Sequence, residues 1–261
     1  MNEFEELRHW LLVFTFSLPR ILATFTMMPV FSRQVLPGMV RNGVAASLAL
    51  FIFPVVVVDA PVADLTLISG LGVLIKEVFI GLLIGFGVAA LFWSIEAAGF
   101  FIDNQRGSTM ASSLNPLTGS QTSPMGILFV QTLNVIFFVG GGLLVVLGAL
   151  YTSYQLWPVF SFFPRVEWDA VPYFLGILDR IMALAVLMAA PVIIAMFLAE
   201  FALGLISRFA PQLNVFFLAM PIKSAVGIFI LVLYAGILIG YYNDELKKLA
   251  THFTALNGLF R

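Results

Sequence analysis

Long apolar stretches alternate with short polar ones along the whole sequence. A membrane-spanning helix needs about twenty mostly apolar residues, and the stretches that approach or exceed this length lie at about residues 10–31, 40–58, 65–101, 125–151, 171–201 and 213–242. The strands of a membrane barrel are shorter and alternate strictly in polarity, which these stretches do not do. The pattern therefore predicts an all-α, polytopic membrane protein of about six hydrophobic helices.

The composition agrees with a membrane protein and argues against several other classes. Hydrophobic residues make up 61% of the chain and charged residues 10%, whereas roughly a quarter of an ordinary globular chain is charged. The net charge of −1 provides no basic field that would attract nucleic acid. Cysteine is absent, so neither disulfides nor thiolate nucleophiles can form.

The basic residues do not define an orientation in the membrane. If the apolar stretches cross in alternation, the two sides collect nearly equal numbers of cations, whereas the positive-inside rule needs a clear bias. Either the number of spans differs, or the helices do not all cross a bilayer in the ordinary way. The two sides are Arg8, Arg165, Lys247, Lys248 and Arg261 against Arg33, Arg41, Arg106 and Arg208.

One connection between apolar stretches is long and polar. Residues 103–124, which we call the polar segment, are rich in Gly, Ser, Asn and Pro and do not favour a stable helix. Connections of this length are often functional. The segment is either a solvated loop or the wall or gate of an aqueous passage, since irregular backbone at membrane depth needs cover from protein or water. Gly107 and Gly119 would then be hinges, and Asp103 and Arg106 an ion pair that latches the segment.

Small residues recur at four-residue spacing in two of the apolar stretches. Gly81 and Gly85 form one pair and Gly236 and Gly240 another. This spacing is typical of helices that approach each other closely, within a chain or across an assembly. The run from Gly85 to residue 90 also matches a dinucleotide fingerprint, but it lies inside an apolar helix and not between a strand and a helix, so close packing is favoured.

Two pairs of adjacent, opposite charges lie within apolar stretches. They are Lys76 with Glu77 and Asp179 with Arg180. Adjacent residues on a helix do not face each other, so each is expected to find a partner elsewhere. Charged residues within membrane helices either pair between helices or subunits or form a proton or ion relay. We favour pairing, because no chain of titratable groups at one depth is evident.

The sequence does not support an enzyme. A serine nucleophile needs a general base, and the two histidines, His9 and His252, lie outside the apolar stretches. No G-x-S-x-G or H-E-x-x-H motif is present, and no cluster of Cys and His indicates a metal or a cofactor. We therefore expect no catalytic, cofactor or metal site.

Two motifs resemble a known family. Residues 101–107 (FIDNQRG) with 114–119 (LNPLTG), and residues 208–217 (RFAPQLNVFF) with 220–223 (MPIK), resemble the FliR/YscT/SpaR family of type III secretion export-apparatus proteins. The length and the order of apolar stretches agree from end to end. The Asp-Asn-Gln-Arg-Gly string looks more like the virulence injectisome branch than the flagellar branch.

The resemblance implies a subunit of a helical, hetero-oligomeric export gate in the bacterial inner membrane, built from helical hairpins. Its implied partners are subunits of the FliP/YscR/SpaP and FliQ/YscS/SpaQ types, a switch protein of the FlhB/YscU/SpaS type, and unfolded secreted proteins. Residues 1–164 would resemble the larger companion and 165–261 the small one. Subunit packing in the assembly would hide apolar surface away from the bilayer plane, which would explain the weak charge bias.

The resemblance also implies functional positions. Within the polar segment, the channel or gating residues would be Asp103, Asn104, Gln105, Arg106, Gly107, Asn115, Pro116 and Gly119. Packing in the assembly would use Gly81, Gly85, Arg208, Pro211, Asn214, Pro221 and Lys223. The alternative is a stand-alone transporter of small solutes, which would need inverted repeats and a site at mid-membrane; we find no internal repeat.

Overall fold

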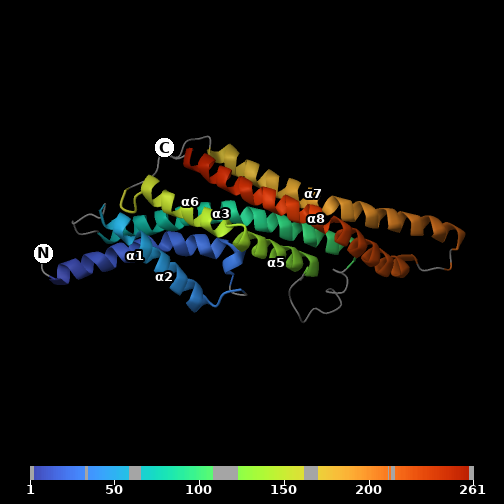
Figure 1. Cartoon of the computed structure of the whole chain (residues 1–261), viewed down its shortest axis with the longest axis horizontal. Coiled ribbons are helices and arrows are strands. Elements are labelled where there is room, and N and C mark those ends of the chain that lie inside the picture. Colours follow the sequence, from blue (N-terminus) through green and yellow to red (C-terminus); the bar gives the residue numbers. More distant parts are fainter. Residues whose placement is uncertain are drawn as a thin grey trace. The chain divides into compact units, whose positions relative to one another are not determined.

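The structure is a computed structural model of the chain, and all of its regular elements in the described residues are helices (Figure 1). It describes residues 3–32, 35–58, 66–107, 123–161, 170–210, 212 and 215–258. The helices are α1 (Glu3–Met27), the short 3₁₀ helix η1 (Pro29–Phe31), α2 (Gly38–Val58), α3 (Leu67–Gln105), α5 (Pro124–Val139), α6 (Gly142–Leu156), α7 (Ala170–Phe209) and α8 (Val215–Gly258). The predicted all-α architecture is confirmed.

Five helices in the described part of the chain are long and apolar enough to span a membrane: α1, α2, α3, α7 and α8. The count becomes six when α5 and α6 are taken together as one broken span. Proline does not end these helices, since α1 continues through Pro19 and α7 through Pro191. The chain is an integral membrane protein by the length and composition of its helices.

The stretch at 125–151, expected to be one helix, is interrupted. Gly140 closes α5 with a hydrogen bond from its N–H to the carbonyl of Ile136, and Gly141 adopts a left-handed conformation with φ of 77°. Glycine adopts this conformation at little cost, whereas other residues do so rarely. Three consecutive glycines, at 140–142, therefore separate α5 from α6.

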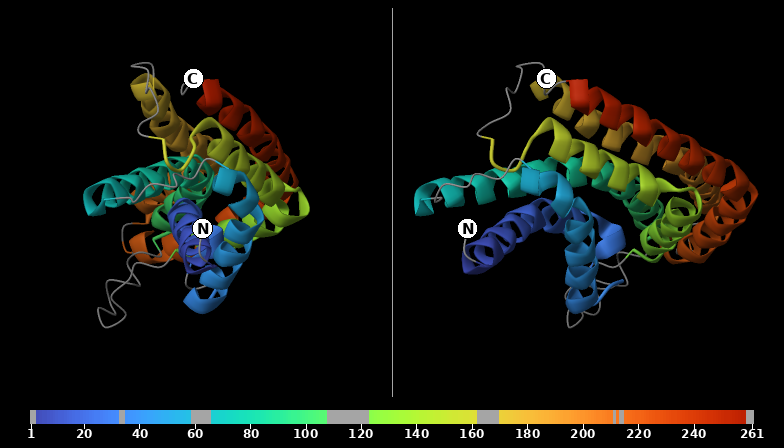
Figure 2. Two further views of the ribbon diagram at one scale, coloured as in Figure 1. Left: turned by 90° about the vertical axis from the view of Figure 1, so that its left-hand side faces the viewer. Right: turned by 60° about the vertical axis from the view of Figure 1, so that its left-hand side comes forward.

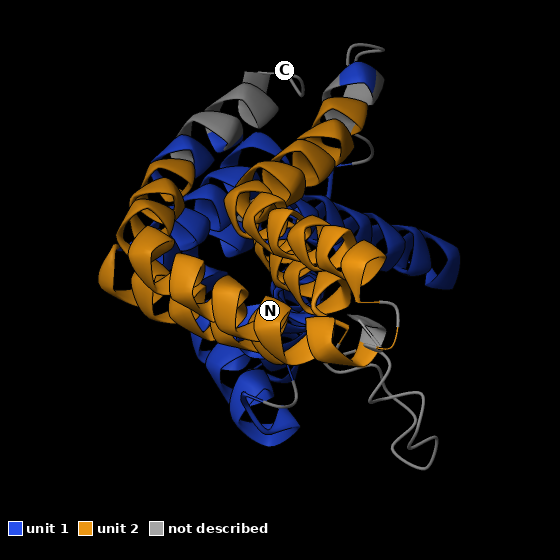
Figure 3. Cartoon of the chain, turned by 90° about the vertical axis from the view of Figure 1, so that its right-hand side faces the viewer, with its two compact units in different colours: residues 1–90, 141–174, 247–261 blue, residues 91–140, 175–246 orange. Residues whose placement is uncertain are grey.

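The chain forms two compact units, coloured separately in Figure 3. Unit 1 contains residues 1–90, 141–174 and 247–261, and unit 2 contains residues 91–140 and 175–246. The boundary predicted at 164/165 lies outside the described residues, so the division into 1–164 and 165–261 stays a prediction.

Unit 1 is organised by a close crossing of α1 and α3. A Cβ atom on Gly81 would lie 2.2 Å from the Arg20 carbonyl oxygen, and one on Gly85 would lie 2.7 Å from the Met27 Cβ. The close approach expected from the glycine spacing therefore occurs within the chain. The helix α2 lies beside α1 (Figure 2). In contrast, Gly236 and Gly240 on α8 have open space at their Cβ positions.

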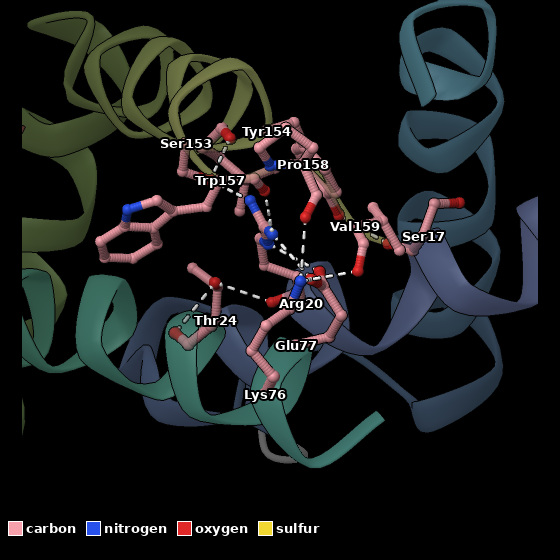
Figure 4. Close-up of polar contacts among 12 residues, drawn as sticks. Ser17, Arg20, Thr24, Lys76, Glu77, Ser153, Tyr154, Trp157, Pro158 and Val159 are labelled. Atoms are coloured by element: carbon pink, nitrogen blue, oxygen red, sulfur yellow. Dashed lines mark hydrogen bonds and ion pairs between the residues drawn. The ribbon is translucent and has the colours of Figure 1, made fainter. Parts of the chain in front are cut away.

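A buried ion cluster joins α1 to α3 inside unit 1 (Figure 4). The Arg20 guanidinium donates to both Glu77 carboxylate oxygens, at 2.7 and 2.8 Å, and both side chains are fully buried. It also donates to the Ser153 hydroxyl at 3.0 Å and the Trp157 carbonyl at 2.8 Å, and it lies over the Tyr154 ring. This charge pairing between helices confirms the structural interpretation of Glu77.

Lys76 fixes the segment that follows α6. Its ammonium donates to the carbonyls of Pro158, Val159 and Ser161 at 2.9, 2.6 and 3.0 Å. It also lies 3.1 Å from a Glu77 oxygen. Each of the two charges therefore has the expected partner elsewhere, Arg20 for Glu77 and the three carbonyls for Lys76, and the two adjacent side chains also meet, which was not expected (Figure 4). The site holds two cations and one carboxylate, and each of these buried groups has hydrogen-bond or ion-pair partners, without which a buried charge would be costly.

Large apolar side chains remain exposed on several helices. In the most apolar 18-residue stretch of α3, 61% of the residues are buried. In the corresponding stretches of α2 and α8, only 22% of the residues are buried. Met39 and Phe51 on α2 and Phe217 and Val232 on α8 are among the exposed residues. Helices with this many exposed apolar side chains require lipid or protein to cover them.

Candidate functional site

The two ends of the polar segment are described, and they lie in unit 2. Residues 103–107 complete α3 and its terminal turn, and residues 123–126 begin α5; we call these two pieces the stem. Residues 108–122 lie outside the described part, and with them the candidates Asn115, Pro116 and Gly119.

Gly107 ends the turn that follows α3. Its φ is +82°, and its N–H donates to the Asn104 carbonyl at 3.1 Å. A left-handed residue just after a helix is usually glycine, because a Cβ in that conformation crowds the backbone. The conformation suits a turn that redirects the chain out of α3.

Asp103 joins the two pieces of the stem. Its carboxylate, 1% exposed, accepts hydrogen bonds from the Ser123 hydroxyl at 2.6 Å and from the Met125 N–H at 2.9 Å. Arg106 lies 2.8 Å from its other oxygen, so the predicted Asp103–Arg106 pair is confirmed. The pair does more than the sequence indicated, because the same carboxylate binds the N-terminus of α5.

The start of α5 is built to receive this carboxylate. Ser123 is the N-cap, and its hydroxyl oxygen accepts a hydrogen bond from the Gly126 N–H at 2.9 Å. Pro124 follows at the first helical position, where no N–H is needed. The first-turn N–H groups and the helix dipole both favour a negative charge here.

The two helices touch directly beneath this junction. A Cβ atom on Gly99 would lie 2.4 Å from the backbone nitrogen of Gly126. Backbone contact of this kind admits only glycine, and Gly99 lies one helical turn before Asp103. Gly99, Ser123 and Gly126 were not predicted from the sequence, although the four-residue step from Gly99 to Asp103 and the Ser-Pro start of α5 were available as signals.

The second motif meets the stem from the α8 side. A Cβ atom on Gly107 would lie 3.6 Å from the Met220 methyl. Lys223, 8% exposed, pairs with Glu200 of α7 at 2.9 Å, and the Gln105 amide lies 3.4 Å from the same Glu200 oxygen. The structure thus brings together Gln105, Gly107 and Lys223, which the sequence singled out separately, and adds Glu200 and Met220.

The remaining predicted positions lie beside this junction or elsewhere in the chain. Asn104 and Pro221 adjoin it in sequence and, like Arg208, are exposed, whereas Gly81 and Gly85 belong to the α1–α3 crossing. Pro211 and Asn214 lie outside the described residues. Arg180 pairs with Glu245 of α8, whereas Asp179 is exposed.

The junction connects helices through ion pairs and hydrogen bonds. Its charged groups bind one another or the backbone. The Asp103 carboxylate accepts from a helix N–H group and pairs with the Arg106 guanidinium, and the Lys223 ammonium pairs with a second carboxylate. In the residues that the structure describes, no group of three His, Cys, Asp or Glu side chains could hold a metal ion. The arrangement can hold the ends of the polar segment in register.

Comparison with known proteins covers almost the whole chain. The model of the family described as bacterial export proteins, family 1, matches residues 11–249. Yop proteins translocation protein T of Yersinia pestis is 52% identical over 225 residues, which is 86% of each chain. Secretion system apparatus protein SsaT of Salmonella typhimurium is 34% identical over 94% of this chain and 95% of its own.

A flagellar relative is also similar, at a lower identity. Flagellar biosynthetic protein FliR of Bacillus subtilis is 31% identical over 84% of both chains. The higher identity to the translocation protein agrees with the injectisome branch indicated by the sequence motif.

Proposed function

Because this chain belongs to family 1 of the bacterial export proteins, we propose that it is a non-enzymatic subunit of a type III secretion export gate in the bacterial inner membrane. Family membership supports a role in protein export. The proposed cargo is unfolded polypeptide, whose varied side chains require a passage without a specific binding site. Small polar residues of the kind found at 108–122 suit the lining of such a passage.

We propose that the polar segment contributes to the channel and its closure. The observation that carries this proposal is the Asp103 carboxylate, which binds both ends of the segment. The segment therefore leaves α3 and enters α5 at one point, beside the Gly99–Gly126 contact. A connection held at both ends can occupy a passage without separating the helices that support it.

The proposed partners are subunits of the FliP/YscR/SpaP and FliQ/YscS/SpaQ types and the FlhB/YscU/SpaS-type switch protein. The exposed apolar faces of α2, α7 and α8 offer the surface that such neighbours would cover. A neighbour would also remove these helices from lipid contact, which accounts for the weak charge bias between the two sides.

Co-expression with the neighbouring membrane subunits tests this function. The expected result is one stable, large hetero-oligomer in mild detergent, whose resting ion leak rises when part of 108–122 is deleted. An isolated monomer that takes up a small solute would instead support the transporter. An assembled complex with an unchanged leak and unchanged secretion after the deletion would remove the gating role.

A further inference from the structure

Glu200 lies between the stem and the beginning of α8. One of its carboxylate oxygens is 2.9 Å from the Lys223 ammonium and 3.4 Å from the Gln105 amide nitrogen. Its side chain is 45% exposed, whereas that of Lys223 is 11% exposed. The carboxylate thus has one largely buried cationic partner and one neutral partner on α3.

The two contacts differ in strength. A hydrogen bond between charged groups at 2.9 Å is among the stronger kinds in proteins. The amide contact at 3.4 Å is beyond the usual range for N–H···O bonds and is therefore weak. When α3 and α7 separate slightly, the Gln105 contact breaks first and Glu200 stays on Lys223.

A second contact couples the same elements. Met220 lies one turn before Lys223 on α8, and its methyl would be 3.6 Å from a Cβ on Gly107, an ordinary packing distance. The terminal turn of α3 therefore rests on α8 through Met220 and on α7 through Glu200. The Asp103 carboxylate connects the same end of α3 to α5 through the Met125 N–H.

We propose that Glu200 is a positioning residue for the stem, and that its contact with Gln105 holds the end of α3 beside α7 while the passage is closed. This inference rests on the proposed gating function and names the residue that sets the resting position of the gate. The Lys223 pair keeps the carboxylate in place, and the weak Gln105 contact is the one released when the passage opens.

The alternative is that Glu200 only neutralises Lys223 within an apolar helix pair. Substitutions at Gln105 separate the two roles, because they change the contact with α3 and retain both Lys223 and Glu200. Gln105→Glu places a like charge beside Glu200, and Gln105→Lys places an opposite one. Positioning predicts opposite effects from these two variants, whereas neutralisation predicts none.

The test measures ion leak and secretion per assembled complex, using the full chain in its secretion apparatus. We expect Gln105→Glu to raise the leak and Gln105→Lys to lower both leak and secretion, by about twofold to tenfold, as for one weak hydrogen bond gained or lost. Gln155→Glu and Gln155→Lys, at an exposed glutamine on α6, serve as matched controls. Effects of equal sign at Gln105, or none, would overturn the inference.

A reversible crosslink provides the second measurement. The chain has no cysteine, so Gln105→Cys with Glu200→Cys can be joined selectively by a bifunctional thiosulfonate and released by a reductant. We expect the crosslinked complex to stop secreting and the reduced complex, which lacks the Glu200 contact, to secrete again with a raised resting leak. Continued secretion by the crosslinked complex would contradict the inference.

The two proposals fail in different ways. A deletion within 108–122 that leaves the leak unchanged would overturn the gating function and this inference together. A deletion that raises the leak, combined with Gln105 variants that do not change it, would overturn the inference alone.

Discussion

Asp103, in the last turn of α3, accepts a hydrogen bond at 2.9 Å from the backbone N–H of Met125, 22 residues later in the first turn of α5. This bond closes the polar segment at its base. Because the acceptor is a carboxylate and the donor a helix N-terminus, the bond is supported by charge as well as by geometry.

Replacement of Asp103 tests this closure. Asp103→Asn keeps the shape of the side chain but removes its charge, and one of its two terminal atoms can no longer accept. We expect a destabilisation of about 1–3 kcal/mol, the cost of weakening hydrogen bonds to a charged group. Thermal unfolding of the purified complex measures it, and the leak per complex should rise. Asp179→Asn, at an exposed aspartate of α7, is the matched control; equal effects of the two substitutions would argue against the closure.

Gly107 provides a backbone test. Gly107→Ala must place a Cβ in a left-handed conformation, at a cost of about 1–2 kcal/mol, although the nearest atom is a flexible methionine methyl. Gly107→Asn should be tolerated better, since asparagine adopts this conformation more readily. Secretion and complex yield compare the two. Alanine performing as well as glycine would show that the turn does not need this conformation.

A bulky side chain at the same position tests the gating role: Gly107→Trp should change gating without loss of assembly.

Gly81 tests the α1–α3 crossing. Gly81→Leu places side-chain atoms where the Arg20 carbonyl and the Ala23 Cβ already lie, so we expect the two helices to separate and the protein to be degraded. Gly87→Ala, in the same helix but with open space at its Cβ, should be neutral. The amount of full-length protein in membranes distinguishes them. Similar amounts for both variants would contradict the crossing.

The buried pair Arg20–Glu77 predicts which of two variants, a single and a double substitution, is the less stable. Glu77→Met leaves two buried cations, Arg20 and Lys76, without a counter-charge, and we expect a loss of about 3–5 kcal/mol, as for breaking a buried ion pair. The double substitution Glu77→Met with Arg20→Met leaves only Lys76, which keeps its carbonyl partners, and should cost less. Thermal unfolding of the purified single and double variants decides the order. A double variant less stable than the single one would contradict this reasoning.

Features that depend on neighbouring residues were predicted correctly from the sequence. The length of the apolar stretches predicted the helices, apart from the break between α5 and α6, since about twenty residues cross the hydrocarbon core and a helix satisfies its own backbone. The Gly81–Gly85 spacing predicted a close approach, and Asp103 with Arg106, three residues apart, predicted an ion pair. Each inference depends on backbone geometry within one or two helical turns, which the residue order determines directly.

Partners distant in the sequence required the tertiary structure. Glu77 lies 57 residues from Arg20, and Glu200 lies 95 residues from Gln105. The contact of Gly99 with Gly126 and the bond from Met125 to Asp103 likewise depend on which helix faces pack together. Many apolar faces could pack in similar ways, because apolar attraction has no direction. The sequence therefore determined the helices and their local pairs, whereas packing decided which charges meet and how the ends of the polar segment are held.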